Sequence, residues 1–152
     1  MNVILDTNLL ISSFLSKNTR EQLEQIVISP HIQLLVCDDL LREYSEVLQR
    51  PKFHISEHQV RSYLAFLRPK FKHIELVSET YLCRDIKDNF LLALARDGKA
   101  SYLITGDKDL TTIGFFEQTR IVTLTKFLQY FWLAIGITKY FIQPDGFFIW
   151  LN

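Results

Sequence analysis

Residues 102–110 read Tyr-Leu-Ile-Thr-Gly-Asp-Lys-Asp-Leu, a short apolar run followed by turn residues and two acids. The run predicts a buried strand, and the Thr-Gly pair predicts a tight exit that leaves Asp107 just beyond the strand's carboxyl end. The chain opens in the same way, because the apolar residues 2–5 are followed by Asp6. Acids at the ends of buried strands add little to a core, but hard divalent cations prefer oxygen ligands of this kind.

Short strands alternate with helices along the rest of the chain. The strands are predicted at Val3–Asp6, Gln33–Cys37, His73–Val77, Tyr102–Thr105 and Arg120–Leu124. The helices are predicted at Leu9–Leu15, Arg20–Ile28, Leu40–Gln49, Glu57–Leu67 and Asp88–Arg96, the last stopped by Gly98 as a C′ residue. This alternation predicts an α/β fold with a parallel sheet covered on both faces. Such sheets bind ligands outside the carboxyl ends of their strands, where Asp6 and Asp107 would lie.

Two further acids fall on predicted helices. Glu43 comes three residues after Leu40 and four before Val47, so it borders the apolar stripe of its helix. Glu46 points away from that stripe. Asp88 opens a helix that is apolar almost all round and should be buried. A charged side chain at the edge of a buried face needs a partner or an ion.

Each acid also has an ordinary structural interpretation. An aspartate before a helix is a common N-cap, which would account for Asp6 and for Asp88, with Asp85 as a rival acid. The Gly-Asp-Lys-Asp stretch is good turn chemistry, and either Asp107 or Asp109 could cap the short helix that starts near Leu110. Glu43 could be an ordinary solvated side chain.

Together, these segments resemble the PIN-domain ribonucleases, in particular the single-domain VapC-like toxins of toxin–antitoxin pairs. The similar segments are the opening Leu-Asp-Thr-Asn at 5–8, Glu43 after the second strand, residues 84–95 and residues 103–110. The resemblance implies a three-layer α/β/α fold with about five parallel strands. It also implies Mg²⁺ or Mn²⁺ bound by four catalytic acids that hydrolyse RNA phosphodiesters, with an antitoxin protein as partner. The four acids are Asp6, Glu43, Asp88 and Asp107.

The metal-binding interpretation is chemically consistent. Four crowded carboxylates repel one another, so cations must neutralise them, and the cations could then activate a water molecule. Asn8, Thr105 and Asp109 are predicted to orient the carboxylates.

Composition limits how the chain could bind nucleic acid. Its 152 residues suggest one domain, and 17 basic residues balance 17 acidic ones, so bulk charge gives no attraction for RNA. Residues 52–72 hold five basic residues and one acid, and we predict an RNA-facing or partner-facing surface there, against the alternative of a solvated helix face. Its members are Lys52, Arg61, Arg68, Lys70 and Lys72. Two cysteines without ligand spacing argue against a zinc site and against a disulfide framework.

The resemblance ends near residue 128, so residues 1–136 are predicted as the PIN-like nuclease domain. Residues 137–152 are predicted as an aromatic-rich hairpin that turns at Pro144-Asp145-Gly146. Left in water, its aromatic side chains would form a large apolar patch, so we expect it to pack on its own domain or on a second copy in a homodimer. The apolar stretch Phe127–Ile137 is too short to span a membrane, and the N-terminus lacks a signal peptide, which predicts a cytoplasmic protein.

Two other classes of function fit parts of the sequence. A receiver-like signalling domain would explain Asp38-Asp39 after a strand, but the third predicted strand ends near Val77 without the phosphoacceptor aspartate. A PIN-like binding module without catalysis is the other alternative, and the presence of all four acids weighs against it.

Overall fold

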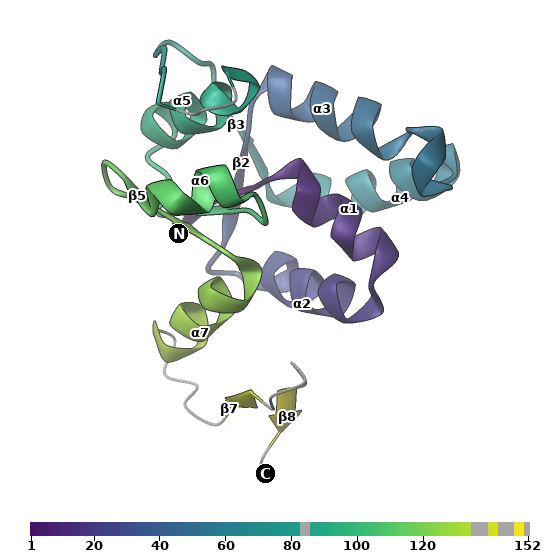
Figure 1. Cartoon of the computed structure of the whole chain (residues 1–152). Helices are drawn as coiled ribbons and strands as arrows, with labels where there is room; N and C mark the ends of the chain where they lie inside the picture. The colour runs from purple at the N-terminus through teal and green to yellow at the C-terminus, as the bar shows by residue number, and fades with distance from the viewer. Residues whose placement is uncertain (83–85, 135–139, 143–147, 151–152) are drawn as a thin grey trace.

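A sheet of six strands, in the order β3-β2-β1-β4-β6-β5, forms the centre of the described structure (Figure 1). The computed structural model describes residues 1–82, 86–134, 140–142 and 148–150. The strands are β1 (Asn2–Leu5), β2 (Gln33–Val36), β3 (Phe71–His73), β4 (Tyr102–Ile104), β5 (Phe115–Phe116) and β6 (Thr119–Val122). All neighbours pair in parallel except β5, which pairs antiparallel with β6. The predicted parallel sheet is therefore confirmed, with one additional antiparallel edge strand.

Helices cover both faces of this sheet. In Figure 1, α1–α4 lie on one side of the sheet, and α5 and α6 lie on the other, which gives the predicted three-layer α/β/α arrangement. Each predicted helix is present. The bounds are α1 (Thr7–Leu15), α2 (Lys17–Ile28), α3 (Asp38–Leu48), α4 (Glu57–Leu67), α5 (Asn89–Asp97), α6 (Lys108–Ile113) and α7 (Leu124–Ala134), with 3₁₀ turns η1 (Pro51–Phe53), η2 (Arg68–Lys70) and η3 (Ile86–Asp88).

The central strands are apolar because both of their faces are covered. Val3 and Ile4 of β1 and Leu103 and Ile104 of β4 are fully buried. Continuous apolar runs are typical of such strands, since alternation with polar residues would place polar groups against a helix layer. The two runs pair in register, with Leu5 opposite Ile104. The residues that follow them are therefore neighbours at the same end of the sheet.

The predicted position of the third strand was wrong by a few residues. The strand was expected at His73–Val77, whereas β3 covers Phe71–His73. After Ile74, whose N–H still bonds to the carbonyl oxygen of Val36, the chain leaves the sheet. Its alternation of apolar and polar residues continues because Ile74 and Leu76 pack on the core from a loop. Val77 is 84% exposed, which shows that the strand has ended before it.

The prediction of Gly98 as a left-handed C′ residue was also wrong. Gly98 has a right-handed backbone (φ −84°), and the left-handed residue is Lys99 (φ 50°). Close packing explains the glycine instead. A Cβ atom at this position would lie 2.5 Å from Cδ1 of Leu35 and 2.9 Å from the carbonyl oxygen of Leu94.

The C-terminal prediction is tested only in part. Strands β7 (Tyr140–Ile142) and β8 (Phe148–Trp150) pair antiparallel, as the arms of a hairpin do. The predicted turn at residues 144–146 lies outside the described residues. The division at residue 136 and the packing of the tail therefore remain predictions. Within the described residues, no helix combines the length and apolar character needed to cross a membrane.

Candidate active site

The ends of β1 and β4 bring Asp6 and Thr105 together. The backbone N–H of Asp6 donates to the carbonyl oxygen of Ile104 (3.0 Å), which continues the ladder one residue past β1. Behind this edge, the hydroxyl group of Tyr44 on α3 donates to the carbonyl oxygen of Leu5 (2.5 Å). This buried contact holds α3 against the end of β1, so the helix that carries Glu43 is fixed relative to Asp6.

Asp6 is a buried carboxylate with several hydrogen-bond donors around it. It is 4% exposed, and its Oδ2 accepts hydrogen bonds from Thr105 Oγ1 and from Asn8 Nδ2 (3.2 Å). It also caps α1 by a long contact with the backbone N–H of Asn8 (3.5 Å). Burial raises the pKa of Asp6, and the charge of Asp107 adds to this increase, while the hydrogen bonds from Thr105 and Asn8 oppose it. Asp6 therefore caps α1 and at the same time lies near a second carboxylate, that of Asp107.

Thr105 connects Asp6 to Asp107. While its hydroxyl group donates to Asp6, the same oxygen accepts a hydrogen bond from the backbone N–H of Asp107 (2.9 Å). Asp107 is the N-cap of α6, with Oδ1 accepting from the backbone N–H groups of Asp109 (2.7 Å) and Leu110 (3.1 Å). Asp107 therefore supplies the cap, and the backbone N–H of Asp109 is one of its two donors. These contacts fix the direction of both carboxylates.

Glu43 lies half-buried on α3, whereas Glu46, one turn later, is exposed. Burial raises the pKa of Glu43, and the negative charge of Asp6 raises it further, while the charge of Arg50 opposes the increase. The Thr7 hydroxyl group is close to the Glu43 carboxylate and also opposes the increase in its pKa. The geometry between the two groups does not meet the criteria for a hydrogen bond. Glu43 is therefore more buried than Glu46, as predicted, but both side chains line the pocket described below.

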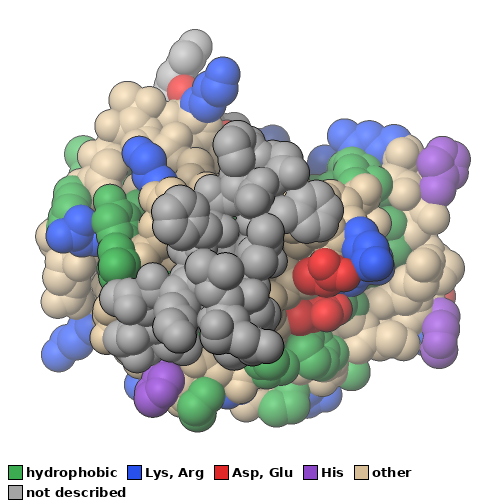
Figure 2. Space-filling model, turned by 90° about the horizontal axis from the view of Figure 1, so that it is seen from below, with side chains coloured by type: hydrophobic (Ala, Val, Ile, Leu, Met, Phe, Trp, Pro, Cys, Tyr) green, Lys and Arg blue, Asp and Glu red, His purple; other side chains and the backbone are tan. Residues whose placement is uncertain are grey.

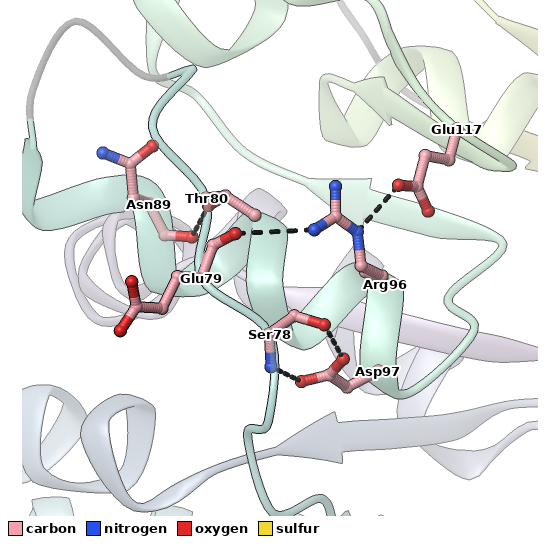
Figure 3. Close-up of polar contacts among 7 residues, drawn as sticks. All are labelled: Ser78, Glu79, Thr80, Asn89, Arg96, Asp97 and Glu117. Atoms are coloured by element: carbon pink, nitrogen blue, oxygen red, sulfur yellow. Dashed lines mark hydrogen bonds and ion pairs between the residues drawn. The ribbon is translucent and has the colours of Figure 1, made fainter.

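Asp88 ends the 3₁₀ turn η3 and precedes α5, but its side chain makes no capping hydrogen bond. The loop before this turn lies along α5 (Figure 3). The Asp97 carboxylate accepts from the backbone N–H groups of Val77 (2.8 Å) and Ser78 (3.0 Å), and Thr80 donates to the carbonyl oxygen of Asn89 (2.6 Å). The hydrogen bonds from Ser78 and Val77 lower the pKa of Asp97, although its small burial acts in the opposite direction.

Arg96 adds a second attachment for the same loop. Its guanidinium group donates to the carbonyl oxygen of Glu79 (3.4 Å) and pairs with the carboxylate of Glu117 (2.7 Å), as Figure 3 shows. Residues 77–80 are thus attached at both ends of α5, near Asp97 and near Asn89. This places the N-terminal end of α5, with Asp88 beside it, in a defined position.

All four predicted acids line one pocket of about 600 Å³. This volume is within the range of pockets that hold small ligands. Six carboxylates and three cationic side chains line it, which leaves a formal excess of three negative charges. The lining residues are Asp6, Asn8, Asp39, Arg42, Glu43, Glu46, Val47, Arg50, Lys87, Asp88, Phe90 and Asp107.

The basic residues of the pocket are not those predicted from the sequence. Lys52, Arg61, Arg68, Lys70 and Lys72 lie on η1, α4, η2 and β3, and none of them lines the pocket. Three of them have neighbours of their own. Arg61 pairs with Glu57 (3.1 Å), Lys52 lies over the ring of Phe53, and Nζ of Lys70 donates to the carbonyl oxygen of Ser29 (2.8 Å).

The cations that do line the pocket are Arg42, Arg50 and Lys87. Sequence reasoning missed them, although Arg50 follows Glu43 by seven residues, which is two helical turns. Lys87 directly precedes Asp88 in the sequence. On the face of the molecule seen in Figure 2, Lys and Arg side chains are scattered and do not gather into one patch.

The residue types that line the pocket suit a divalent cation, whereas the present positions of their side chains do not. The four predicted acids line one pocket, and burial, with a smaller contribution from the charge of Asp107, raises the pKa of Asp6, as expected where a cation would neutralise a carboxylate. Within the described residues, however, no three His, Cys, Asp or Glu side chains converge closely enough to hold a metal ion. A site made of three or more of these side chains would require some of them to turn from the positions seen here.

Comparison with known proteins identifies the family. No curated protein matches the sequence. The fold is similar to a crystal structure of VapBC2 from Rickettsia felis bound to a DNA fragment from its promoter, with 14% identity over 80% of this chain and 97% of that one and a TM-score of 0.54. The PIN domain endonuclease Utp24 is similar over 79% of this chain and 82% of that one, with 20% identity and a TM-score of 0.48. The sequence model of the PIN domain matches residues 2–109. The chain therefore belongs to the PIN domain family.

Proposed function

We propose that this chain is a divalent-metal-dependent endoribonuclease that hydrolyses RNA phosphodiesters in the pocket beside Asp6. The observation that carries the proposal is the buried Asp6 carboxylate, which shares one pocket with Glu43, Asp88 and Asp107. A buried carboxylate next to other carboxylates is costly unless something positive compensates it. PIN-domain membership supports a nuclease-type function for such a site.

Asp6, Glu43, Asp88 and Asp107 would hold Mg²⁺ or Mn²⁺. When bound, such a cation supplies an activated water molecule and stabilises negative charge on the phosphate group. The protein's own contribution is to orient the carboxylates. Thr105 and Asn8 hold Oδ2 of Asp6, and the N-terminal turn of α6 holds Oδ1 of Asp107. Oδ2 of Asp107, and Oδ1 of Asp6 beside its long contact with the backbone N–H of Asn8, are the oxygen atoms that we expect to face a substrate or an ion.

A cleavage assay on fluorescently labelled RNA tests the proposal. Wild-type protein should cleave in Mg²⁺ or Mn²⁺ and stop in EDTA, and Asp6→Asn or Asp107→Asn should abolish cleavage without loss of the folded state by circular dichroism. The matched control is Glu57→Gln, because Glu57 is an exposed acid that pairs with Arg61 away from the pocket. Near-wild-type turnover by either aspartate variant would remove that residue from the catalytic set.

One observation favours a second candidate, a PIN-like binding module without hydrolysis. No three acidic, histidine or cysteine side chains converge on a point within the described part of the chain. A binding module would retain RNA affinity in the same assay but leave the RNA intact at any concentration of Mg²⁺ or Mn²⁺. Isothermal titration with Mn²⁺ separates the two further, since only the nuclease requires an Asp6-dependent metal site.

The toxin role is a finer part of the proposal and rests on the resemblance to VapC-like proteins. Induced expression in the cytoplasm of a bacterial host should arrest growth, and Asp6→Asn should relieve the arrest. An antitoxin protein and a second copy of the chain are the proposed partners. Sedimentation of the purified chain tests the homodimer, and co-purification with a protein encoded next to it tests the antitoxin.

A further inference from the structure

One face of α3 forms a charged wall of the pocket. The pocket-lining residues from this helix and its end are Asp39, Arg42, Glu43, Glu46, Val47 and Arg50, at positions i, i+3, i+4, i+7, i+8 and i+11. This spacing places them on one side of the helix. Arg42 pairs with Asp39 (3.2 Å), so the charge of its guanidinium group is partly offset within the wall. Arg50 follows the C-terminal end of α3 and is exposed, and its charge acts on Glu43.

A second wall comes from η3 and the first turn of α5. It contributes Lys87, which is exposed, and Phe90, which is half-buried and packs partly against the core. Asp6 and Asp107, at the ends of β1 and β4, line the same pocket. Its exposed cations therefore include two from separate segments of the chain, Arg50 after α3 and Lys87 in η3, and the second of these has an aromatic ring, Phe90, three residues away.

The charge of the pocket makes these cations necessary for a polyanionic substrate. Six carboxylates oppose three cations, so a phosphodiester strand would be repelled by the pocket as a whole. Metal ions bound by the acids would reduce this repulsion only next to those acids. Contacts to the phosphate groups on either side of the reacting one must come from side chains at the rim, and positively charged side chains supply most such contacts.

We propose that Arg50 and Lys87 bind the phosphate groups on either side of the scissile bond of a single-stranded RNA, and that a neighbouring base packs on Phe90. This inference rests on the proposed function for the identity of the substrate. The strand is single because an aromatic ring can stack only on a base whose face is exposed. The contacts to phosphate predict affinity without strong sequence preference, since phosphate groups are the same at every nucleotide.

Fluorescence anisotropy with a labelled single-stranded RNA tests the inference in EDTA, where cleavage does not occur. Arg50→Gln and Lys87→Gln should each lower the slope of log affinity against log salt by about 0.7, the value for one phosphate contact to a single strand. By the same relation, each should weaken binding about fivefold at 0.1 M salt. The matched control is Lys126→Gln, an exposed cation on α7 that neither lines the pocket nor belongs to the basic residues between 52 and 72. It should leave the slope unchanged.

The outcomes separate this inference from the proposed function. Reduced slopes together with no cleavage in Mg²⁺ or Mn²⁺ would support the phosphate contacts and refute hydrolysis. Normal cleavage with unchanged slopes in both variants, or an equal loss in Lys126→Gln, would refute the phosphate contacts and leave hydrolysis standing. Duplex RNA of the same sequence should bind more weakly than the single strand, and equal affinity would overturn the stacking on Phe90. Thermal melts of each variant identify any loss that comes from unfolding.

Discussion

Replacing Thr105 by valine should reveal how strongly the ionised Asp6 depends on its hydrogen-bond donors. Thr105 is 1% exposed, and its hydroxyl group both donates to Asp6 and accepts from the backbone N–H of Asp107. Valine keeps the shape of the side chain and removes both contacts. A hydrogen bond to a charged group contributes about 1.5–3 kcal/mol, and an unsatisfied buried donor costs about 1–3 kcal/mol.

We therefore expect Thr105→Val to lose about 2.5–4 kcal/mol of unfolding free energy at neutral pH, in the lower part of the sum of these two magnitudes, because Asp107 is only partly buried. For a chain of this size, such a loss lowers the melting temperature by roughly 5–15 °C. Thr105→Ser keeps the hydroxyl group and removes one buried methyl group, so it should lose only about 1 kcal/mol. Urea denaturation followed by circular dichroism measures both values.

The difference between these variants should depend on pH in a defined direction. Burial holds the pKa of Asp6 above its value of 3.8 in the unfolded chain, and the Thr105 hydrogen bond opposes that increase. Protonation therefore stabilises the folded state as pH falls through the raised pKa toward 3.8, and valine raises the pKa further. The gap between the valine variant and the wild type should consequently shrink as pH falls. Equal losses for valine and serine at pH 7, or a gap that grows in acid, would refute this account.

Three further substitutions test the site and the packing around it. Glu43→Gln should lower RNA cleavage about 10- to 100-fold and Glu46→Gln much less, because Glu43 is half-buried beside Asp6 whereas Glu46 is exposed; equal rates would contradict this. Gly98→Ala should cost about 1–2 kcal/mol in a urea melt, since its Cβ would overlap the side chain of Leu35. Gly106→Ala should cost nothing and gain up to about 1 kcal/mol, because no atom lies within 4 Å of the added Cβ. The reverse order for the two glycines would show that the backbone adjusts freely at residue 98.

The sequence was informative wherever the signal was local. The apolar runs at residues 2–5 and 102–104 predicted two strands buried on both faces, and both are present. Because the carboxyl ends of neighbouring parallel strands meet, these runs also predicted that Asp6 and Asp107 lie at one edge of the sheet. The position of Glu43 at the edge of the buried face could be predicted from Leu40 and Val47, because a regular helix repeats its faces every few residues.

Sequence patterns that occur in regular elements and also in loops led to less accurate predictions. Residues 74–77 alternate as a strand does, but they leave the sheet, because the Asp97 carboxylate binds the N–H groups of Val77 and Ser78. Gly98 follows a helix, as a C′ glycine does, but its close packing against Leu35 of β2 explains why this residue is a glycine. In both places the deciding atom comes from a residue at least 19 positions away along the chain.

The chain by itself thus determined the family, the order of most of its elements and four of the six acids that line the pocket. Only the tertiary structure decided how those acids are surrounded. The Thr105 hydroxyl group reaches Asp6 across 99 residues, and Arg50 and Lys87 come to the rim of one pocket from separate helical segments. Charge density in the sequence pointed instead to residues 52–72, none of which lines the pocket. Local patterns encode which face of an element is buried, whereas the neighbours of a side chain depend on the order of the strands and on how the helices pack across them.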